Sequence, residues 1–148
     1  MREYESADIT VIDTKSASLG EGLLVYYACE LLKDGKSKQF IVDWIENNKL
    51  KLNHWFTVEN LKYLKRGGRL SAASAVIGTI LDIKPVLHVD DEGRLVPVTR
   101  VKGRRKSLKA LAEKLEEMIT NPEEQVIAIS HGDCLDDVEY LKGLILKK

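Results

Sequence analysis

The sequence has few of the features that mark a membrane, secreted or metal-binding protein. Only two cysteines occur in 148 residues, and the separation of Cys29 and Cys134 matches no metal-ligand pattern. Each lies beside apolar residues in a segment that we expect to be helical, so two buried thiols are predicted. No apolar run is long enough to span a bilayer, and the first residues lack the apolar stretch of a signal peptide. The predicted location is therefore the cytoplasm.

The balanced charge and the absence of several known motifs argue against further classes of protein. The 23 basic and 23 acidic residues give a formal net charge of zero, which argues against bulk attraction to nucleic acid or to an anionic membrane. The chain contains no Walker A loop, no glycine-rich dinucleotide motif and no Gly-x-Ser-x-Gly elbow. Its histidines, His54, His88 and His131, do not have the spacing of a zinc site.

The apolar pattern predicts an α/β fold. Two short apolar runs, 9–13 and 125–130, are typical of buried parallel strands. Residues 84–89 and 95–101 are expected to form a hairpin around a turn-rich connection, and Pro97 predicts an edge position or a bulge. This hairpin argues against a purely parallel sheet. Helices are predicted at 18–34, 37–48, 61–66, 70–81, 104–118 and 136–146.

Arg69 is the first candidate for binding an anion. A short helix is expected to end at Gly67 and Gly68, because glycine tolerates positive φ, and Arg69 would then project before a second helix that Ser71 can cap. A helix N-terminus beside an arginine favours an anion. The plainer alternative is a tight turn between helices with a solvated arginine.

A second cationic group follows in residues 100–109. Arg100 and Lys102 share one face of the predicted strand, since side chains alternate at period two. Arg104 and Arg105 begin the next helix, where cations oppose the helix dipole, so we expect an anionic partner for some of them. A solvated basic face is the alternative. Nearby apolar residues could wall a cavity or simply form the core: Val76, Ile77, Ile80, Leu81 and Ile83.

Several strings in this order resemble the DegV family. They cover nearly the whole chain and are Val11-Ile12-Asp13-x-x-x-Ala17-Ser18-Leu19-Gly20-x-Gly22, Leu61-x-x-Leu64-x-x-Gly67-Gly68-Arg69-Leu70-Ser71, Leu81-x-Ile83-Lys84-Pro85-Val86-Leu87, Val98-x-Arg100-x-Lys102-Gly103-x-x-Lys106 and Ile129-Ser130-His131-Gly132-Asp133. The resemblance implies a two-domain α/β protein. Residues 1–51 would be a remnant of the first, parallel-sheet domain with its connecting helices. Residues 52–148 would form most of the second domain, a mixed sheet with helices.

The resemblance also implies a function. A long-chain fatty acid would lie in an apolar tunnel, and its carboxylate would be presented to an ATP-using kinase subunit for phosphorylation, feeding phospholipid synthesis at the membrane surface. The chain itself would not be an enzyme and would need no cofactor or metal. The implied ligand-binding residues are Arg69, Ser71, Ile77, Ile80, Leu81 and Arg100, while Arg69, Arg100 and Lys102 would contact phosphate or the kinase.

The resemblance further implies that the chain is truncated at both ends. The family's Thr- and Ser-rich loops that hold the carboxylate would precede residue 9, and a final strand with a histidine and a Gly-Pro-Gly segment would follow residue 148. Three alternatives remain open. They are a substrate-binding subunit similar to that of dihydroxyacetone kinase, a domain fragment without function, and a nucleic-acid-binding or regulatory protein that uses residues 100–109.

Overall fold

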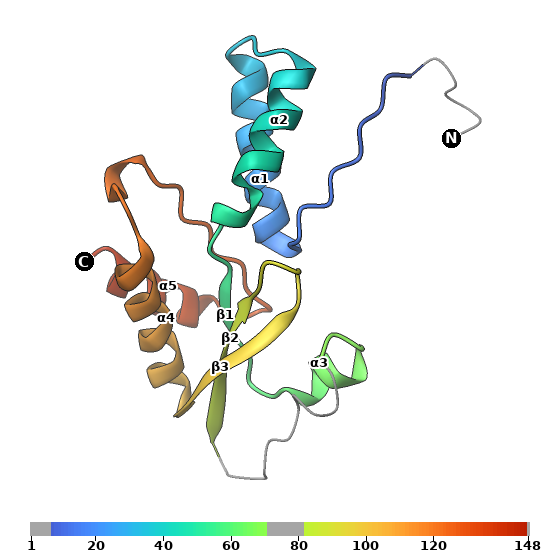
Figure 1. The fold of residues 1–148 in the computed structure, drawn as a ribbon. Helices are drawn as coiled ribbons and strands as arrows, with labels where there is room; N and C mark the ends of the chain where they lie inside the picture. The colour runs from blue at the N-terminus through green and yellow to red at the C-terminus, as the bar shows by residue number, and fades with distance from the viewer. Residues whose placement is uncertain (1–6, 71–81, 148) are drawn as a thin grey trace.

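The computed structural model describes residues 7–70 and 82–147. The main elements are the helices α1 (Ser18–Lys33), α2 (Lys38–Asn48), α3 (Lys62–Arg66), α4 (Arg104–Met118) and α5 (Leu135–Ile145) and the strands β1 (Trp55–Thr57), β2 (Ile83–Val89) and β3 (Leu95–Lys102). Two short 3-10 turns, η2 (Lys49–Lys51) and η3 (Pro122–Glu124), follow α2 and α4. In Figure 1 the α1–α2 pair stands at one end of the sheet, and α4 and α5 lie together on one side of it.

Helices α1 and α2 form an antiparallel pair. Gly35, at a φ of +74°, makes the reversal between them, in a conformation that favours glycine. Ser37 then caps α2, because the backbone N–H of Phe40 donates to its hydroxyl at 3.2 Å. Tyr27 packs on Trp44 with ring centroids 5.4 Å apart, which fixes the contact between the two helices.

The three strands make an antiparallel sheet in the order β1-β2-β3. The predicted hairpin is confirmed, and its turn closes through the Asp90 carbonyl, which accepts the N–H of Gly93 at 2.8 Å. The register shifts between Val86 and Leu87, which pair with Thr99 and Pro97, so Val98 is the extra residue of a bulge. Strand β3 is thus both an edge strand and a bulged one, as Pro97 predicted.

The two faces of the sheet are covered differently. On one face Leu87 forms a buried cluster with Leu61 and Leu70, which flank α3. On the other face α4 packs against all three strands, and the ammonium of Lys114 lies 5.7 Å from the ring centre of Trp55. Helices α3 and α4 therefore lie on opposite sides of the sheet (Figure 1). Burial on both faces explains why β2 is an almost continuous apolar run.

The predicted α/β class is confirmed, but two predicted strands are wrong. Residues 9–13 and 125–130 are extended, are not part of a sheet, and are largely exposed. An isolated strand cannot satisfy its backbone N–H and C=O groups, and no described strand lies beside either segment to pair with it. Apart from Leu70, the predicted helix at 70–81 lies outside the described residues. So do four of the five apolar residues that could wall a cavity, namely Val76, Ile77, Ile80 and Leu81.

Two smaller findings concern the thiols and the helices. Cys29 is exposed on α1 rather than buried, while Cys134 is half-buried just before α5. Cys29 was expected to be buried because its neighbours are apolar, but that side of α1 has no covering layer among the described residues. No helix in the described part of the chain is both long and apolar enough to cross a membrane.

Candidate functional site

Arg69 projects from a turn that the two glycines build. The N–H groups of Gly67 and Arg69 donate to carbonyls of α3 at 2.9 Å each, and Gly68 has a φ of +71°. Of the two glycines, only Gly68 uses positive φ, because Gly67 stays helical at −76°. Arg69 is exposed and donates to the Gly67 carbonyl, while the next residue, Leu70, is buried against the sheet.

Arg100 lies on the same face of the sheet as the Arg69 segment. Cross-strand partners share a face, and Arg100 pairs with Pro85, two residues before Leu87 of the buried cluster. Lys102 pairs with Ile83 on that face as well. Arg100 is exposed and lines a shallow groove with residues 97–99 at the bulge. The two arginines thus lie on one side of the sheet, on separate segments.

The remaining predicted ligand contacts, Ser71, Ile77, Ile80 and Leu81, lie outside the described residues. Their roles and those of Arg69, Arg100 and Lys102 stay predictions. Ile83, which begins β2, is half-buried.

The cations at the start of α4 serve the fold. Nε of Arg104 donates to Oδ2 of Asp137 on α5 at 2.7 Å, and both side chains are partly buried. The guanidinium of Arg105 lies 4.1 Å from the ring centre of Tyr140, also on α5. The predicted anionic partner is therefore Asp137, and this pair holds α5 against α4.

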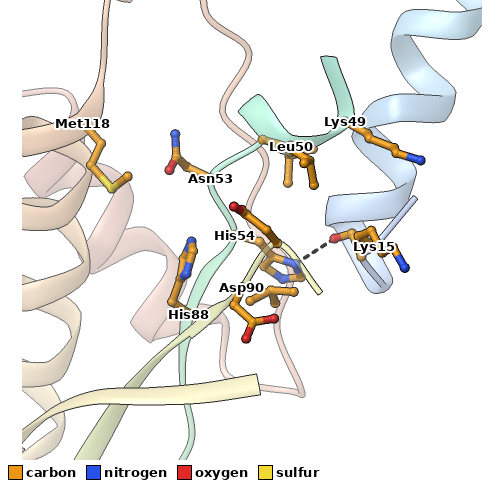
Figure 2. A pocket seen from close by; sticks show the side chains of 12 residues that line it. Lys15, Lys49, Leu50, Asn53, His54, His88, Asp90 and Met118 are labelled. Atoms are coloured by element: carbon orange, nitrogen blue, oxygen red, sulfur yellow. Dashed lines mark hydrogen bonds between the residues drawn. The ribbon is translucent and has the colours of Figure 1, made fainter. Parts of the chain in front are cut away.

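A pocket of about 200 Å³ lies where the segment before α1 meets the sheet, and our sequence analysis did not predict it. Ser16 Oγ lies 3.1 Å from Nδ1 of His54, and His88 on β2 lies on the other side of His54 (Figure 2). Gly20 permits this contact, because a Cβ there would lie 2.6 Å from Nδ1 of His54 and still closer to Ser16 Oγ. The pairing of Trp55 with His88 brings His54, which directly precedes β1, close to His88, and this pairing is not contained in the local sequence.

The histidines of this pocket favour the neutral form. Burial lowers the pKa of His54, and the nearby His88 lowers it further. Burial also lowers the pKa of His88, against the opposing effect of Asp91 and Asp90. Lys15 and Lys49 line the pocket, but their ammonium groups point away from it (Figure 2). They pair with Asp13 at 2.9 Å and Glu46 at 2.6 Å, respectively.

This pocket does not have the geometry of a hydrolase site. No carboxylate of the described residues hydrogen-bonds to His54, so the Ser16–His54 contact lacks the third group that orients a catalytic histidine. The described side chains also contain no group of three or more histidine, cysteine, aspartate or glutamate residues placed to hold a metal ion. The contact joins the N-terminal helices to the sheet.

Comparisons with known proteins agree with this fold. A family model described as "Uncharacterised protein, DegV family" matches residues 1–148. A DegV domain-containing protein of Clostridium perfringens is 52% identical over 148 residues, which are 100% of this chain and 51% of that protein. The chain belongs to the DegV family, and it spans about half the length of the curated relatives that it matches.

Two solved structures show the same architecture. The fatty acid binding DegV family protein of Streptococcus agalactiae aligns with a TM-score of 0.81 at 37% identity, over 99% of this chain and 51% of that one. The Fatty Acid Kinase (Fak) B3 protein of Streptococcus pneumoniae, loaded with linoleic acid, aligns with a TM-score of 0.70 at 27% identity. That match covers 78% of this chain and 41% of the other.

Proposed function

We propose that this chain takes part in binding a long-chain fatty acid and in presenting its carboxylate to a kinase subunit. The observation that carries the proposal is the match to the Streptococcus agalactiae protein, which binds fatty acid and covers nearly all of this chain. The match to the Fak B3 protein supports the kinase as a partner. In this proposal the kinase subunit binds ATP and transfers its phosphoryl group to the fatty-acid carboxylate in the cytoplasm, leaving ADP, and the chain only holds and presents its ligand.

The arrangement of the sheet supports an acyl ligand on the side of α3. That face carries the cluster of Leu61, Leu70 and Leu87, which is buried and would lie beneath such a ligand. The Arg69 segment and Arg100 lie beside the cluster. An acyl chain gains about 0.8 kcal/mol for each methylene that it buries, so it needs an apolar slot. Its carboxylate needs donors at one end, because an unpaired charge is costly to bury.

Each predicted contact has a role in this proposal. Arg69 and Arg100 would bind the carboxylate, the acyl phosphate or the kinase, and Lys102 would contact phosphate or the kinase. Ser71 would donate to the head group, while Ile77, Ile80 and Leu81 would line the slot for the tail. Exchange of ligand and product would take place at a phospholipid surface.

Uptake of radiolabelled oleate tests the proposal. We expect saturable binding by the chain, or by the chain produced together with the unmatched half of the Clostridium perfringens relative. The Arg69→Ala/Arg100→Ala variant should weaken binding about tenfold, because each arginine contributes a charge-assisted hydrogen bond. Arg94→Ala is the matched control, since this exposed arginine pairs with Asp90 in the hairpin turn. Absence of saturable uptake in both preparations, or ATP turnover by the chain alone, would contradict the proposal.

A further inference from the structure

The pocket between the N-terminal helices and the sheet is separate from the face proposed for the acyl chain. Side chains alternate along β2, so His88 and Leu87 face opposite sides of the sheet, and Leu87 packs in the cluster beside α3. The ring of His88 lies 4.6 Å from that of Trp55, which in turn contacts Lys114 of α4. Met118, at the end of α4, also lines the pocket. The pocket therefore lies on the α4 side and does not belong to the proposed acyl slot.

The lining of this pocket includes polar groups with unused hydrogen-bonding capacity. No hydrogen bond or ion pair in the described part of the chain uses the amide of Asn53, the ring nitrogens of His88 or the carboxylate of Asp91. The neighbouring carboxylate of Asp90 is occupied, since Nε of Arg94 donates to it at 2.9 Å. An amide oxygen, an imidazole nitrogen and a carboxylate are thus available to accept hydrogen bonds from a ligand.

The charges around the pocket favour a cation over an anion. Lys15 and Lys49 point their ammonium groups away from it and pair with other carboxylates (Figure 2). Burial lowers the pKa of His54 and of His88, so both rings favour the neutral form, in which one nitrogen is an acceptor. Among the described residues, Asp91 is then the charged lining group without an ion pair. Its carboxylate attracts an ammonium and repels an anion.

The volume and the apolar walls limit the size and shape of a ligand. The pocket of about 200 Å³ holds about seven water-sized groups, at roughly 30 Å³ each. Leu50 and Met118, which are 54% and 40% exposed, line it together with Leu52 and Val89. A short hydrocarbon chain would remove some of this apolar surface from water. The pocket therefore suits a small molecule with a few methylene groups and a polar end.

We propose that this pocket binds a small, free aliphatic amine, such as a four-carbon amino alcohol. The ammonium would pair with the carboxylate of Asp91 and donate to the free acceptors of Asn53 and His88. The methylene groups would lie against Leu50 and Met118. The site binds its ligand without a chemical step, and it goes beyond the proposed function because it lies on the other side of the sheet.

Titration with three compounds of the same chain length tests the proposal. They are 4-aminobutan-1-ol, 1,4-butanediol and 4-hydroxybutyrate, which differ in the charge of one end. The Cε1–H signals of His54 and His88 in the NMR spectrum report on the pocket, and His131, which does not line it, is an internal control. We expect the amine to shift the first two signals saturably and to bind about fivefold more tightly than the diol. The carboxylate should not bind.

Two variants should change the affinity for the amine in opposite directions. Asp91→Asn removes the unpaired charge and should abolish the preference for the amine over the diol. Asn53→Asp adds a carboxylate and should strengthen binding of the amine about fivefold. Glu92→Gln is the matched control, because Glu92 lies in the same turn but does not line the pocket, and it should leave binding unchanged. All three side chains are exposed, so these variants should keep the fold.

The proposal is overturned if the amine shifts neither pocket histidine, if His131 shifts as much as they do, or if either other compound binds as tightly as the amine. Equal losses for Glu92→Gln and Asp91→Asn, or no gain for Asn53→Asp, would overturn it as well. Phosphatidylethanolamine vesicles distinguish a free amine from a lipid headgroup. They should leave both signals unchanged, and a shift would overturn the assignment to a free ligand. Oleate uptake is measured separately, so its absence beside intact amine binding contradicts only the proposed function.

Discussion

The sheet region, residues 52–147, and the N-terminal region, residues 7–51, bury their apolar side chains to different extents. In the sheet region Val86 and Leu87 are fully buried at the centre of β2, between α4 and the cluster beside α3. In the N-terminal region only Leu24 and Ile45 of the large apolar residues are buried, while eight are exposed and the others are half-buried. The comparison teaches that the described sheet has a core of its own, whereas the helical pair has only a thin one. The domain division at residue 52 stays a prediction. Three experiments test the difference in burial between the two regions.

The largest effect is expected when one buried leucine of each region is replaced by alanine. Leu87→Ala should lower the free energy of unfolding by about 2–5 kcal/mol, because it leaves a cavity inside the buried cluster with Leu61 and Leu70. Leu24→Ala should fall at or below the lower end of that range, since its surroundings are thinner and can relax. Urea unfolding followed by circular dichroism measures both values. Equal losses for the two variants would remove the distinction between the regions.

A smaller effect is expected at the joint between the two regions, which is the contact of Ser16 and Gly20 with His54. Gly20→Ala should lower the free energy of unfolding by about 1–3 kcal/mol, because the new Cβ must displace Ser16 and His54. Gly143→Ala in α5 is the control, since nothing lies within 4 Å of its added Cβ. That change should raise stability by roughly 0.5–1 kcal/mol, because alanine loses less backbone entropy in a helix. If the two alanine variants behave alike, Ser16 and His54 do not form a close-packed joint.

The smallest effect is a pH dependence of the same joint. His54 and His88 have folded-state pKa values below the ordinary 6.5, so the folded chain binds fewer protons than the unfolded chain as the pH falls below that value. Their contribution to stability is therefore present above pH 6.5 and is lost toward lower pH. Urea midpoints between pH 7.5 and 5.5 measure this slope, which His54→Gln should reduce. An unchanged slope in that variant would mean that His54 is not the titrating group.

Local signals in the sequence predicted much of the fold. The helix after Ser37, the turn at Gly67 and Gly68, and the hairpin with its bulge near Pro97 each depend on residues close in sequence. Residues 9–13 and 125–130 were predicted as strands from apolarity alone, but a strand also depends on distant partners, which a local pattern does not contain. The family itself was predicted correctly from the spacing of several strings.

Less of the candidate site than of the fold could be predicted from the sequence. The alternation of side chains along a strand predicted that Arg100 and Lys102 share one face. Only the strand register shows that this is the face covered by Leu61 and Leu70. The His54–His88 pocket depends on the pairing of β1 with β2 and on Ser16, which lies 38 residues from His54. Side-chain groups that meet only through tertiary contacts leave no periodic signal.

The bulge at Val98 also limits how the sheet can grow. An exposed edge strand offers unpaired backbone groups to any other strand, which favours aggregation. In β3 this edge is interrupted by Pro97, which has no N–H to donate, by the bulge, and by the cationic side chains of Arg100 and Lys102. Among the described strands, β3 is therefore a poor template for the addition of a further strand along its free edge.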